Sequence, residues 1–366
     1  MKRTLLTLLQ LAITAGILFL LFRDPETRSE MALALRHADP WWLLAGVAIS
    51  GCVELVGGIR WQYLLYVQDI RLPWWRILAL MIIGVFFNFV APGGTGGDLV
   101  KTFYLMKETP GKRTLALLSV IMDRILGLLS VVVLAAIFIT VRWDWLISTR
   151  SSKQFVFTAL AILAGAVVVI GGSFVLSGLG LVHKLPARMP GRDRLAEFAL
   201  AYNLYAKAWK TTLIAFFASA LANLGYFATF YCAARAMALP GMKLPSLMDV
   251  FAIMPIINTI VSLPVSVGGV GVREGLFQVF LGGLTGISNA VAVVISSTGF
   301  VLTAFWGLVG GLVYMLYRPT DHARLAEIRE EVGTFEHAVA ESEVAMERLE
   351  AEEYSIVQPH NEHTRT

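Results

Sequence analysis

Long runs of apolar residues, broken by short polar segments, extend along most of the chain. Six runs are long enough to cross a bilayer as helices, which takes about 20 residues: they cover 4–22, 41–65, 114–141, 154–176, 209–236 and 287–317. The composition agrees, since 57% of the residues are hydrophobic, 15% are charged and the mean hydropathy is +0.68. The pattern therefore predicts an all-α polytopic membrane protein. The basic and apolar start could also be a signal peptide, but no small-x-small cleavage site follows it, which favours an uncleaved span.

Two pairs of apolar helices are too short to cross. The first pair covers 77–91 and 97–107, and the second covers 247–262 and 271–283. A helix of 15 residues measures about 22 Å, whereas the hydrocarbon core is about 30 Å thick. Both pairs break at P-x-x-x-G-G, with an asparagine before the proline and charges after the glycines. This likeness predicts inverted repeats, each with a broken re-entrant helical hairpin.

Basic residues gather in the loops that would lie on one face if each short pair enters and leaves by the same side. This face carries Lys2, Arg3, Arg71, Arg76, Lys107, Lys112, Arg113, Lys184, Arg188, Arg192, Arg194, Lys207 and Lys210. The positive-inside rule makes that face cytoplasmic. Both termini are then cytoplasmic, the short pairs enter from opposite sides, and residues 23–40 form a loop on the other face.

Charged residues inside the apolar region mark the candidate site, because each is costly in hydrocarbon unless it is paired or wet. They are Glu54, Arg60, Asp98, Lys101, Asp123, Arg124, Arg273 and Glu274. Because arginine can bind phosphate through two hydrogen bonds, these cations favour a lipid headgroup that contains phosphate. The free N–H groups of the half-helices that begin near Gly97 and Gly271 could bind the same anion. The alternative is structural: salt bridges, including an i, i+3 pair of Asp98 and Lys101, snorkelling by Arg60, and glycines that allow close helix packing.

Other chemistry finds little support in the sequence. G-G-T-G-G-D-L-V-K-T lacks the glycine before lysine that a P-loop requires, because Val100 stands there. Cys52 and Cys232 lie in apolar segments as packing residues, and the histidines are scattered. We expect no cofactor, metal, nucleotide or nucleic acid. Tryptophans near helix ends predict an aromatic belt: Trp41, Trp42, Trp61, Trp74, Trp75, Trp143 and Trp145.

The last segment, 318–366, changes character to an acidic tail. Leu325, Ile328, Val332, Phe335 and Val339 recur at alternating spacings of three and four. This heptad-like spacing predicts a C-terminal cytoplasmic helix that forms a homodimeric coiled coil. A single amphipathic helix packed on the basic face is the alternative. We therefore divide the chain into 1–317, a transmembrane domain, and 318–366, the tail.

Four motifs together resemble one family. They are R-W at Arg60–Trp61, N-x-x-x-P-G-G-x-G-G-D-L-x-K at Asn88–Lys101, S-V-x-x-D-R-x-x-G-L at Ser119–Leu128, and P-x-S-x-G-G-x-G-x-R-E-G at Pro264–Gly275. They are similar to the lysylphosphatidylglycerol synthase transmembrane, or flippase-like domain, family over about 1–317. The resemblance implies lipid movement. It does not imply aminoacyl transfer, because an acidic tail stands where the lysyl-transferring members carry a soluble domain.

We therefore expect a lipid translocase of the bacterial or archaeal plasma membrane, and not an enzyme. Its cargo would be an anionic or aminoacylated phospholipid or a polyprenyl-phosphate-linked lipid. The alternatives are a membrane-embedded transferase on lipid-linked sugars and a scaffold that recruits a partner through its tail. The expected substrate-binding residues are Arg60, Asn88, Gly96, Gly97, Asp98, Lys101, Asp123, Arg124, Asn258, Ser266, Gly268, Gly269, Arg273 and Glu274.

Overall fold

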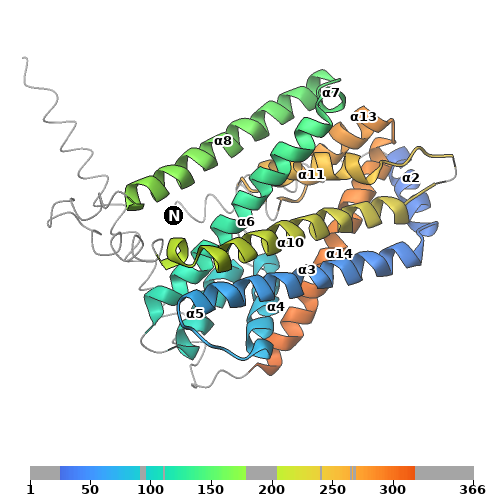
Figure 1. Cartoon of the computed structure of the whole chain (residues 1–366). Helices are drawn as coiled ribbons and strands as arrows, with labels where there is room; N and C mark the ends of the chain where they lie inside the picture. The colour runs from blue at the N-terminus through green and yellow to red at the C-terminus, as the bar shows by residue number, and fades with distance from the viewer. Residues whose placement is uncertain are drawn as a thin grey trace, which may run out of the picture.

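The fold is a bundle of helices, and no strand occurs in the part of the chain that the structure describes (Figure 1). The structure is a computed structural model that describes residues 25–90, 96–109, 112–178, 204–239, 241–263, 266 and 269–317. Its helices are α2 (Pro25–Arg36), α3 (Pro40–Val67), α4 (Trp74–Val90), α5 (Gly96–Glu108), α6 (Arg113–Val141), α7 (Trp143–Leu146), α8 (Arg150–Gly178), α10 (Trp209–Ala236), α11 (Leu247–Val261), α12 (Val272–Phe277), the π-helical turn η3 (Gln278–Gly282), α13 (Gly283–Thr285) and α14 (Asn289–Leu316).

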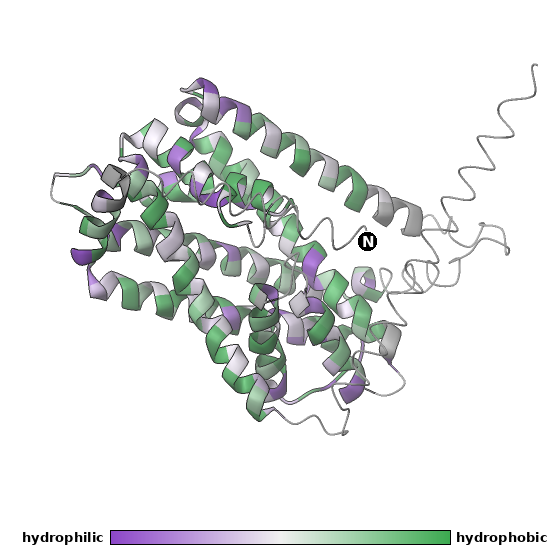
Figure 2. Cartoon of the chain, turned by 180° about the vertical axis from the view of Figure 1, so that it is seen from behind, coloured by the Kyte–Doolittle hydropathy of each residue, from purple (hydrophilic) through white to green (hydrophobic). Residues whose placement is uncertain are grey.

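Five helices are long and apolar enough to cross a membrane: they lie within α3, α6, α8, α10 and α14. This confirms five of the six predicted spans, while the predicted span 4–22 and the tail 318–366 lie outside the described residues. Large apolar side chains point outward one turn apart along α14, at Val301, Phe305, Leu308 and Leu312. Such a face suits lipid, and Figure 2 shows that hydrophobic residues make up much of the helices.

The helices α3 and α10 lie side by side along their length and run in opposite directions (Figure 1). At one end, the backbone N–H of Asp39 donates to the carbonyl of Ala236 at 2.9 Å. At the other end, Nε2 of Gln68 donates to the buried Tyr205 hydroxyl at 2.5 Å, and this hydroxyl donates to the Leu64 carbonyl at 3.2 Å. The antiparallel pair is therefore fastened at both of its ends.

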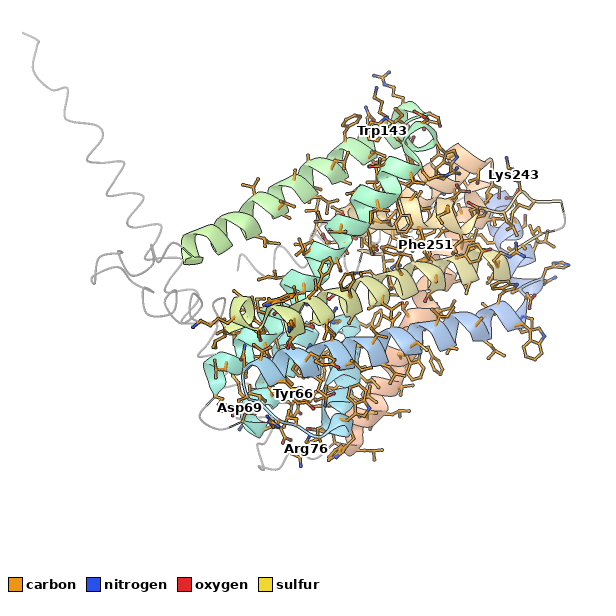
Figure 3. The ribbon with its side chains drawn as sticks, in the orientation of Figure 1. Tyr66, Asp69, Arg76, Trp143, Lys243 and Phe251 are labelled. Carbon is orange, nitrogen blue, oxygen red and sulfur yellow. The ribbon has the colours of Figure 1, made fainter. Side chains whose placement is uncertain are left out.

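The start of the short helix α4 and the end of the short helix α5 lie together at one end of the bundle. Arg76, in the first turn of α4, forms an ion pair with Glu108, the last residue of α5. The Tyr317 hydroxyl, directly after α14, donates to Oε1 of Glu108 at 3.0 Å. Burial, and then the neighbouring Glu108 charge, raise the pKa of the Tyr317 phenol. These three residues form a clamp at the open end of the first hairpin, where Figure 3 labels Arg76.

The second pair of short helices begins at the opposite end. Arg142, directly after α6, forms an ion pair with Asp249 in the first turn of α11. Figure 3 shows Trp143 and Lys243 at this end and Tyr66, Asp69 and Arg76 at the other. The two pairs of short helices thus begin at opposite ends of α6. Their entry from opposite sides of a membrane stays a prediction. The symmetry of inverted repeats stays a prediction.

Three predictions about individual elements are wrong. Residues 23–40 were expected to form a loop, but 25–36 form α2, and Ala34 on it is fully buried. The predicted helix 271–283 is interrupted by the π-helical turn η3. Trp61 does not belong to an aromatic belt, because its side chain is fully buried, whereas Trp41 and Trp75 are 77% and 59% exposed near helix starts.

Candidate functional site

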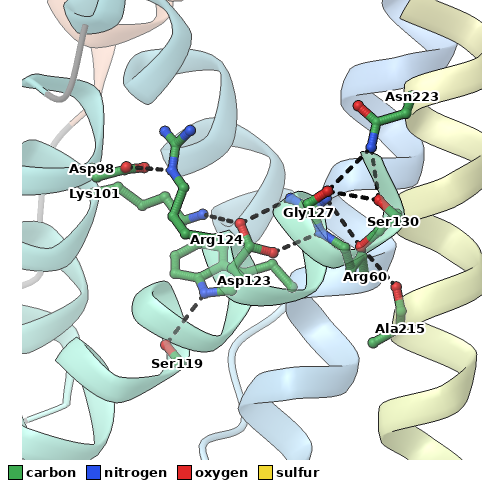
Figure 4. Close-up of polar contacts among 12 residues, drawn as sticks. Arg60, Asp98, Lys101, Ser119, Asp123, Arg124, Gly127, Ser130, Ala215 and Asn223 are labelled. Atoms are coloured by element: carbon green, nitrogen blue, oxygen red, sulfur yellow. Dashed lines mark hydrogen bonds and ion pairs between the residues drawn. The ribbon is translucent and has the colours of Figure 1, made fainter. Parts of the chain in front are cut away.

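The centre of the candidate site is a buried carboxylate that holds two cations from two other helices (Figure 4). Asp123 on α6 accepts from Arg60 on α3 through both oxygens, at 2.6 and 2.9 Å. Lys101 on α5 reaches the same carboxylate at 3.3 Å. The three side chains are 5%, 14% and 4% exposed in that order. Arg60 therefore does not snorkel to the membrane surface; it ties α3 to α6.

The Lys101 ammonium also contacts an aromatic ring. It lies 4.0 Å from the centroid of the Trp61 ring. The Trp61 indole N–H donates to the Ser119 hydroxyl at 3.3 Å, which orients the ring. A desolvated cation over tryptophan gains about 2 kcal/mol. Trp61 thus stabilises the charged lysine in place of the lost water.

Small polar residues extend the network toward α10. Nη1 of Arg60 donates to the Ser219 hydroxyl at 3.3 Å, and Nδ2 of Asn223 donates to the Ser130 hydroxyl at 2.8 Å. The sequence interpretation missed these residues together with Ser119, because a lone Ser or Asn in an apolar helix gives no sign of the partner it meets. These hydrogen bonds give the buried polar groups between α3, α6 and α10 a partner.

A second group of charges at this centre, the ion pair of Arg124 and Asp98, is more exposed than the ion pairs of Asp123. Nε of Arg124 lies 2.5 Å from Oδ2 of Asp98, and the two side chains are 57% and 20% exposed. Asp98 thus pairs with Arg124, and Lys101 pairs with Asp123, so the i, i+3 pair of Asp98 and Lys101 that the structural alternative allowed is not the one that forms. The i, i+3 spacing permits that pair, but α6 brings a partner to each residue. In Figure 4 the terminal nitrogens of Arg124 point away from Asp98, and within the described residues they donate no hydrogen bond.

The start of α5 is held by close packing and by one side chain. Oδ1 of Asn88 on α4 accepts from the Gly97 N–H at 2.9 Å. A Cβ on Gly97 would stand 1.9 Å from the Gly84 carbonyl oxygen, so only glycine fits there. Gly97 is therefore explained by helix packing, and its N–H is occupied, while Gly96 is half-buried beside it.

A separate ionic cluster caps the second broken hairpin. Nη2 of Arg273 donates to Oε1 of Glu274 at 3.0 Å, and the two side chains are 5% and 4% exposed. Glu274 accepts from the Gly271 N–H at 2.6 Å and from the Ser296 hydroxyl at 3.1 Å. The guanidinium carbon of Arg273 lies 4.3 Å from the Phe300 ring centroid. This arrangement fixes the start of α12 against α14.

The other predicted residues of the second break are placed as follows. Gly269 has φ +75°, and a Cβ on it would stand 2.1 Å from Cγ1 of Val261. The Ser266 hydroxyl is buried without a hydrogen bond, and the Asn258 side chain makes none that the described residues show. Within the described residues Asn258 thus shows no counterpart of the Asn88 bond, and Gly268 lies outside them. No hydrogen bond or ion pair in the described ranges joins the two ionic clusters.

The chemistry that the first cluster offers is charge recognition. Among the residues that these ion pairs join, Arg60, Lys101 and Arg124 face the two carboxylates of Asp98 and Asp123, so the pairs alone carry one positive charge in excess (3 − 2 = 1). No group of His, Cys, Asp and Glu that could hold a metal ion occurs among the described residues. The cluster thus suits an anionic group, and Arg124 is its accessible member.

Comparison with known proteins identifies the family of this chain. The model of the family described as "Lysylphosphatidylglycerol synthase TM region" matches residues 7–311. A UPF0104 membrane protein of Pyrococcus horikoshii is 30% identical over 101 residues, which is 27% of this chain and 30% of that protein. A UPF0104 membrane protein of Methanothermobacter thermautotrophicus is 27% identical over 78 residues, which is 21% of this chain and 22% of that protein. The chain thus matches less than a third of the length of either relative. The family match covers most of the chain, and this multi-pass membrane protein belongs to the lysylphosphatidylglycerol synthase transmembrane family.

Proposed function

We propose that this protein is a lipid translocase and not an enzyme. The headgroup of a phosphate-bearing lipid would pass through the polar centre formed by α3, α5 and α6 while its acyl chains stay in the bilayer. Anionic phospholipids, aminoacylated phospholipids and polyprenyl-phosphate-linked lipids share the phosphate that this centre would recognise. Membership of a family named for a lipid-modifying enzyme's membrane region supports a lipid-related role.

The proposal depends mainly on the exposed side chain of Arg124, which lies partway along a helix that could cross the membrane. Arg124 is the twelfth residue of α6, so it lies about 16 Å along the helix from its start. Its side chain is 57% exposed although the helix is apolar enough to cross a membrane. Asp98 occupies Nε and leaves the terminal nitrogens available, and a guanidinium edge binds phosphate through two parallel hydrogen bonds. An exposed arginine at this depth is costly unless a polar guest or water meets it.

The buried neighbours have a different role in this proposal. Asp123 holds Arg60 and Lys101, so these residues supply a fixed positive field and do not contact the phosphate directly. The broken hairpins would supply the moving parts, by rocking against the pair of α3 and α10, much as repeats move against each other in transporters. The cluster at Arg273 would hold the second hairpin together.

The test is lipid movement in reconstituted vesicles that contain fluorescent phosphatidylglycerol, read by bleaching of the outer leaflet. We expect Arg124→Gln to slow movement by about 10- to 100-fold, because a hydrogen bond to a charged group contributes about 1.5–3 kcal/mol. Arg124→Lys should retain part of the rate, since it keeps the charge but loses the paired donors. Arg150→Gln, at the exposed start of α8, is the matched control and should leave the rate unchanged.

Equal rates for wild type and Arg124→Gln would overturn the proposal. Chemical conversion of a labelled lipid-linked sugar by the purified protein would favour the transferase alternative. Loss of function on deletion of 319–366, with lipid movement intact in vesicles, would favour the scaffold alternative.

A further inference from the structure

One carboxylate near this centre has no partner. Glu54 is the fifteenth of the 28 residues of α3, which places it at the middle of a helix that is long enough to cross the membrane. Its side chain is half-buried, and it makes no hydrogen bond or ion pair in the structure as described. Every other carboxylate in the first cluster holds a cation.

The side of α3 that carries Glu54 faces the proposed path. Gly51, Glu54, Gly58 and Trp61 follow one another at helical spacing and share one face. A Cβ on Gly51 would stand 2.4 Å from the Trp306 ring of α14, and one on Gly58 would stand 3.0 Å from the Trp74 ring of α4. Trp61 on the same face is covered by Lys101 of α5. Glu54 thus lies on the side of α3 that packs against α4, α5 and α14.

The charged groups that face Glu54 are few. Arg60 on its own helix and Lys101 on α5 are the charges that act on it. Behind them lie Asp123 and Arg124 on α6 and Asp98 on α5. The sequence of α14 contains no charged residue, and the only one in α4 is Arg76, which pairs with Glu108 in the clamp. On α10, which packs along α3, the charged residues Lys210 and Arg235 stand near the two ends of the helix, and Tyr226 lies between them. The charge balance of the centre therefore depends on these six groups.

Electroneutrality then links Glu54 to the headgroup. Arg60, Lys101 and Arg124 exceed Asp98 and Asp123 by one positive charge, and an ionised Glu54 cancels this excess (3 − 3 = 0). A lipid phosphodiester brings one negative charge. If Glu54 stayed ionised, the centre would hold an unbalanced negative charge in a medium of low dielectric constant, which is strongly unfavourable.

We propose that Glu54 is the proton-binding site of the translocation cycle. Its carboxylate is ionised when the centre is empty, and it takes up one proton from the aqueous phase, as an O–H bond, when a lipid phosphate binds. The proton leaves again when the lipid departs. Lipid and proton are therefore bound together, and the proton is the coupling ion. This inference rests on the proposed function and adds to it the source of energy.

The test is calorimetric binding of a short-chain phosphatidylglycerol to the full-length chain in mild detergent. Titrations in buffers of different ionisation enthalpy, over a series of pH values, count the protons taken up. For wild type we expect about one proton per lipid where Glu54 is ionised, with affinity that falls about tenfold per pH unit in that range. Glu54→Gln, which mimics the protonated form, should bind without proton uptake and with the same affinity at every pH.

Two further variants serve as controls. Glu54→Asp keeps a titratable group and should still take up a proton, so a general defect of position 54 is distinguished from loss of the proton site. Asp144→Asn, at an exposed position on α7, should behave like wild type.

Three results would contradict the inference, and they are distinguishable. Phosphatidylglycerol binding without proton uptake by wild type overturns proton coupling and leaves the translocase intact. Proton uptake that persists in Glu54→Gln assigns the proton to another group. Absence of both binding and lipid movement in wild type overturns the proposed function, and this inference with it.

Discussion

At the scale of single residues, Asp123 balances two cations in a part of the bundle from which water is largely excluded. Removing its charge leaves Arg60 and Lys101 buried without compensation. Loss of one member of a buried ion pair costs about 3–5 kcal/mol. We therefore expect Asp123→Asn to lower the thermal unfolding temperature in detergent markedly.

The matched control is Asp69→Asn, which also removes one charge from an ion-paired aspartate. Asp69 and its partner Arg71 are 79% and 82% exposed, its second partner Lys112 is 39% exposed, and such pairs contribute at most about 1 kcal/mol each. Asp69 has φ +52°, a conformation that asparagine also accepts. Equal shifts in unfolding temperature for the two variants would show that the Asp123 pairs are not structurally important.

The identity of the charged residues could be predicted from the sequence, but their pairing could not. Arg60, Lys101, Asp123 and Arg124 stand out because charges are rare in apolar segments. Arg60 and Asp123 are 63 positions apart, so only the approach of α3 to α6 makes them partners. The i, i+3 spacing allows Asp98 and Lys101 to pair within α5, but α6 offers each of them a counter-charge of its own.

At the scale of elements, the fit of α5 against α4 depends on the absence of a side chain. A Cβ on Gly97 would overlap the Gly84 carbonyl oxygen at 1.9 Å and displace Oδ1 of Asn88 at 2.6 Å. Overpacking of this kind costs about 1–3 kcal/mol. Gly97→Ala should lower the unfolding temperature and also slow lipid movement, because α5 carries Asp98 and Lys101.

Gly165→Ala on α8 is the control, since a Cβ there meets nothing within 4 Å. Alanine is favoured over glycine inside a helix by about 1 kcal/mol, so this variant should be unchanged or slightly more stable. If Gly97→Ala were equally stable, the start of α5 would have to adjust more freely than the packing indicates.

Elements were predictable where apolar runs are long. The helices α3, α6, α8, α10 and α14 lie close to their predicted ranges. The helix α2 was missed because PETRSEMALALR mixes charges with apolar residues, and only its contact with α14 shows why it folds. Nothing in the local sequence indicates the π-helical turn; at Gly282, its last residue, Oδ1 of Asn289 lies 2.6 Å from an added Cβ, so glycine is required there.

At the scale of the whole molecule, the contacts at the two ends define a topology that can be tested. The clamp end holds Arg71, and Ser148 lies at the opposite end after α7. In a chain with both native cysteines replaced by alanine, Ser148→Cys should react with an impermeant maleimide in intact cells. Arg71→Cys should react only after the membrane is permeabilised, because the positive-inside rule places it in the cytoplasm.

The chain without cysteines is the control for background labelling. Labelling of both sites from the same side would contradict the opposite positions of the hairpins. The reversed pattern would keep the fold but invert its orientation, and would place the acidic tail outside.

The antiparallel pair of α3 and α10 has a consequence for measurements of motion. Because hydrogen bonds join its two helices near both ends, at Asp39 and at Gln68, we expect the pair to move as one rigid unit. Spin labels on its outer faces would keep a constant separation, and so provide a fixed coordinate frame. Displacements of the hairpins can then be read as absolute movements against this frame.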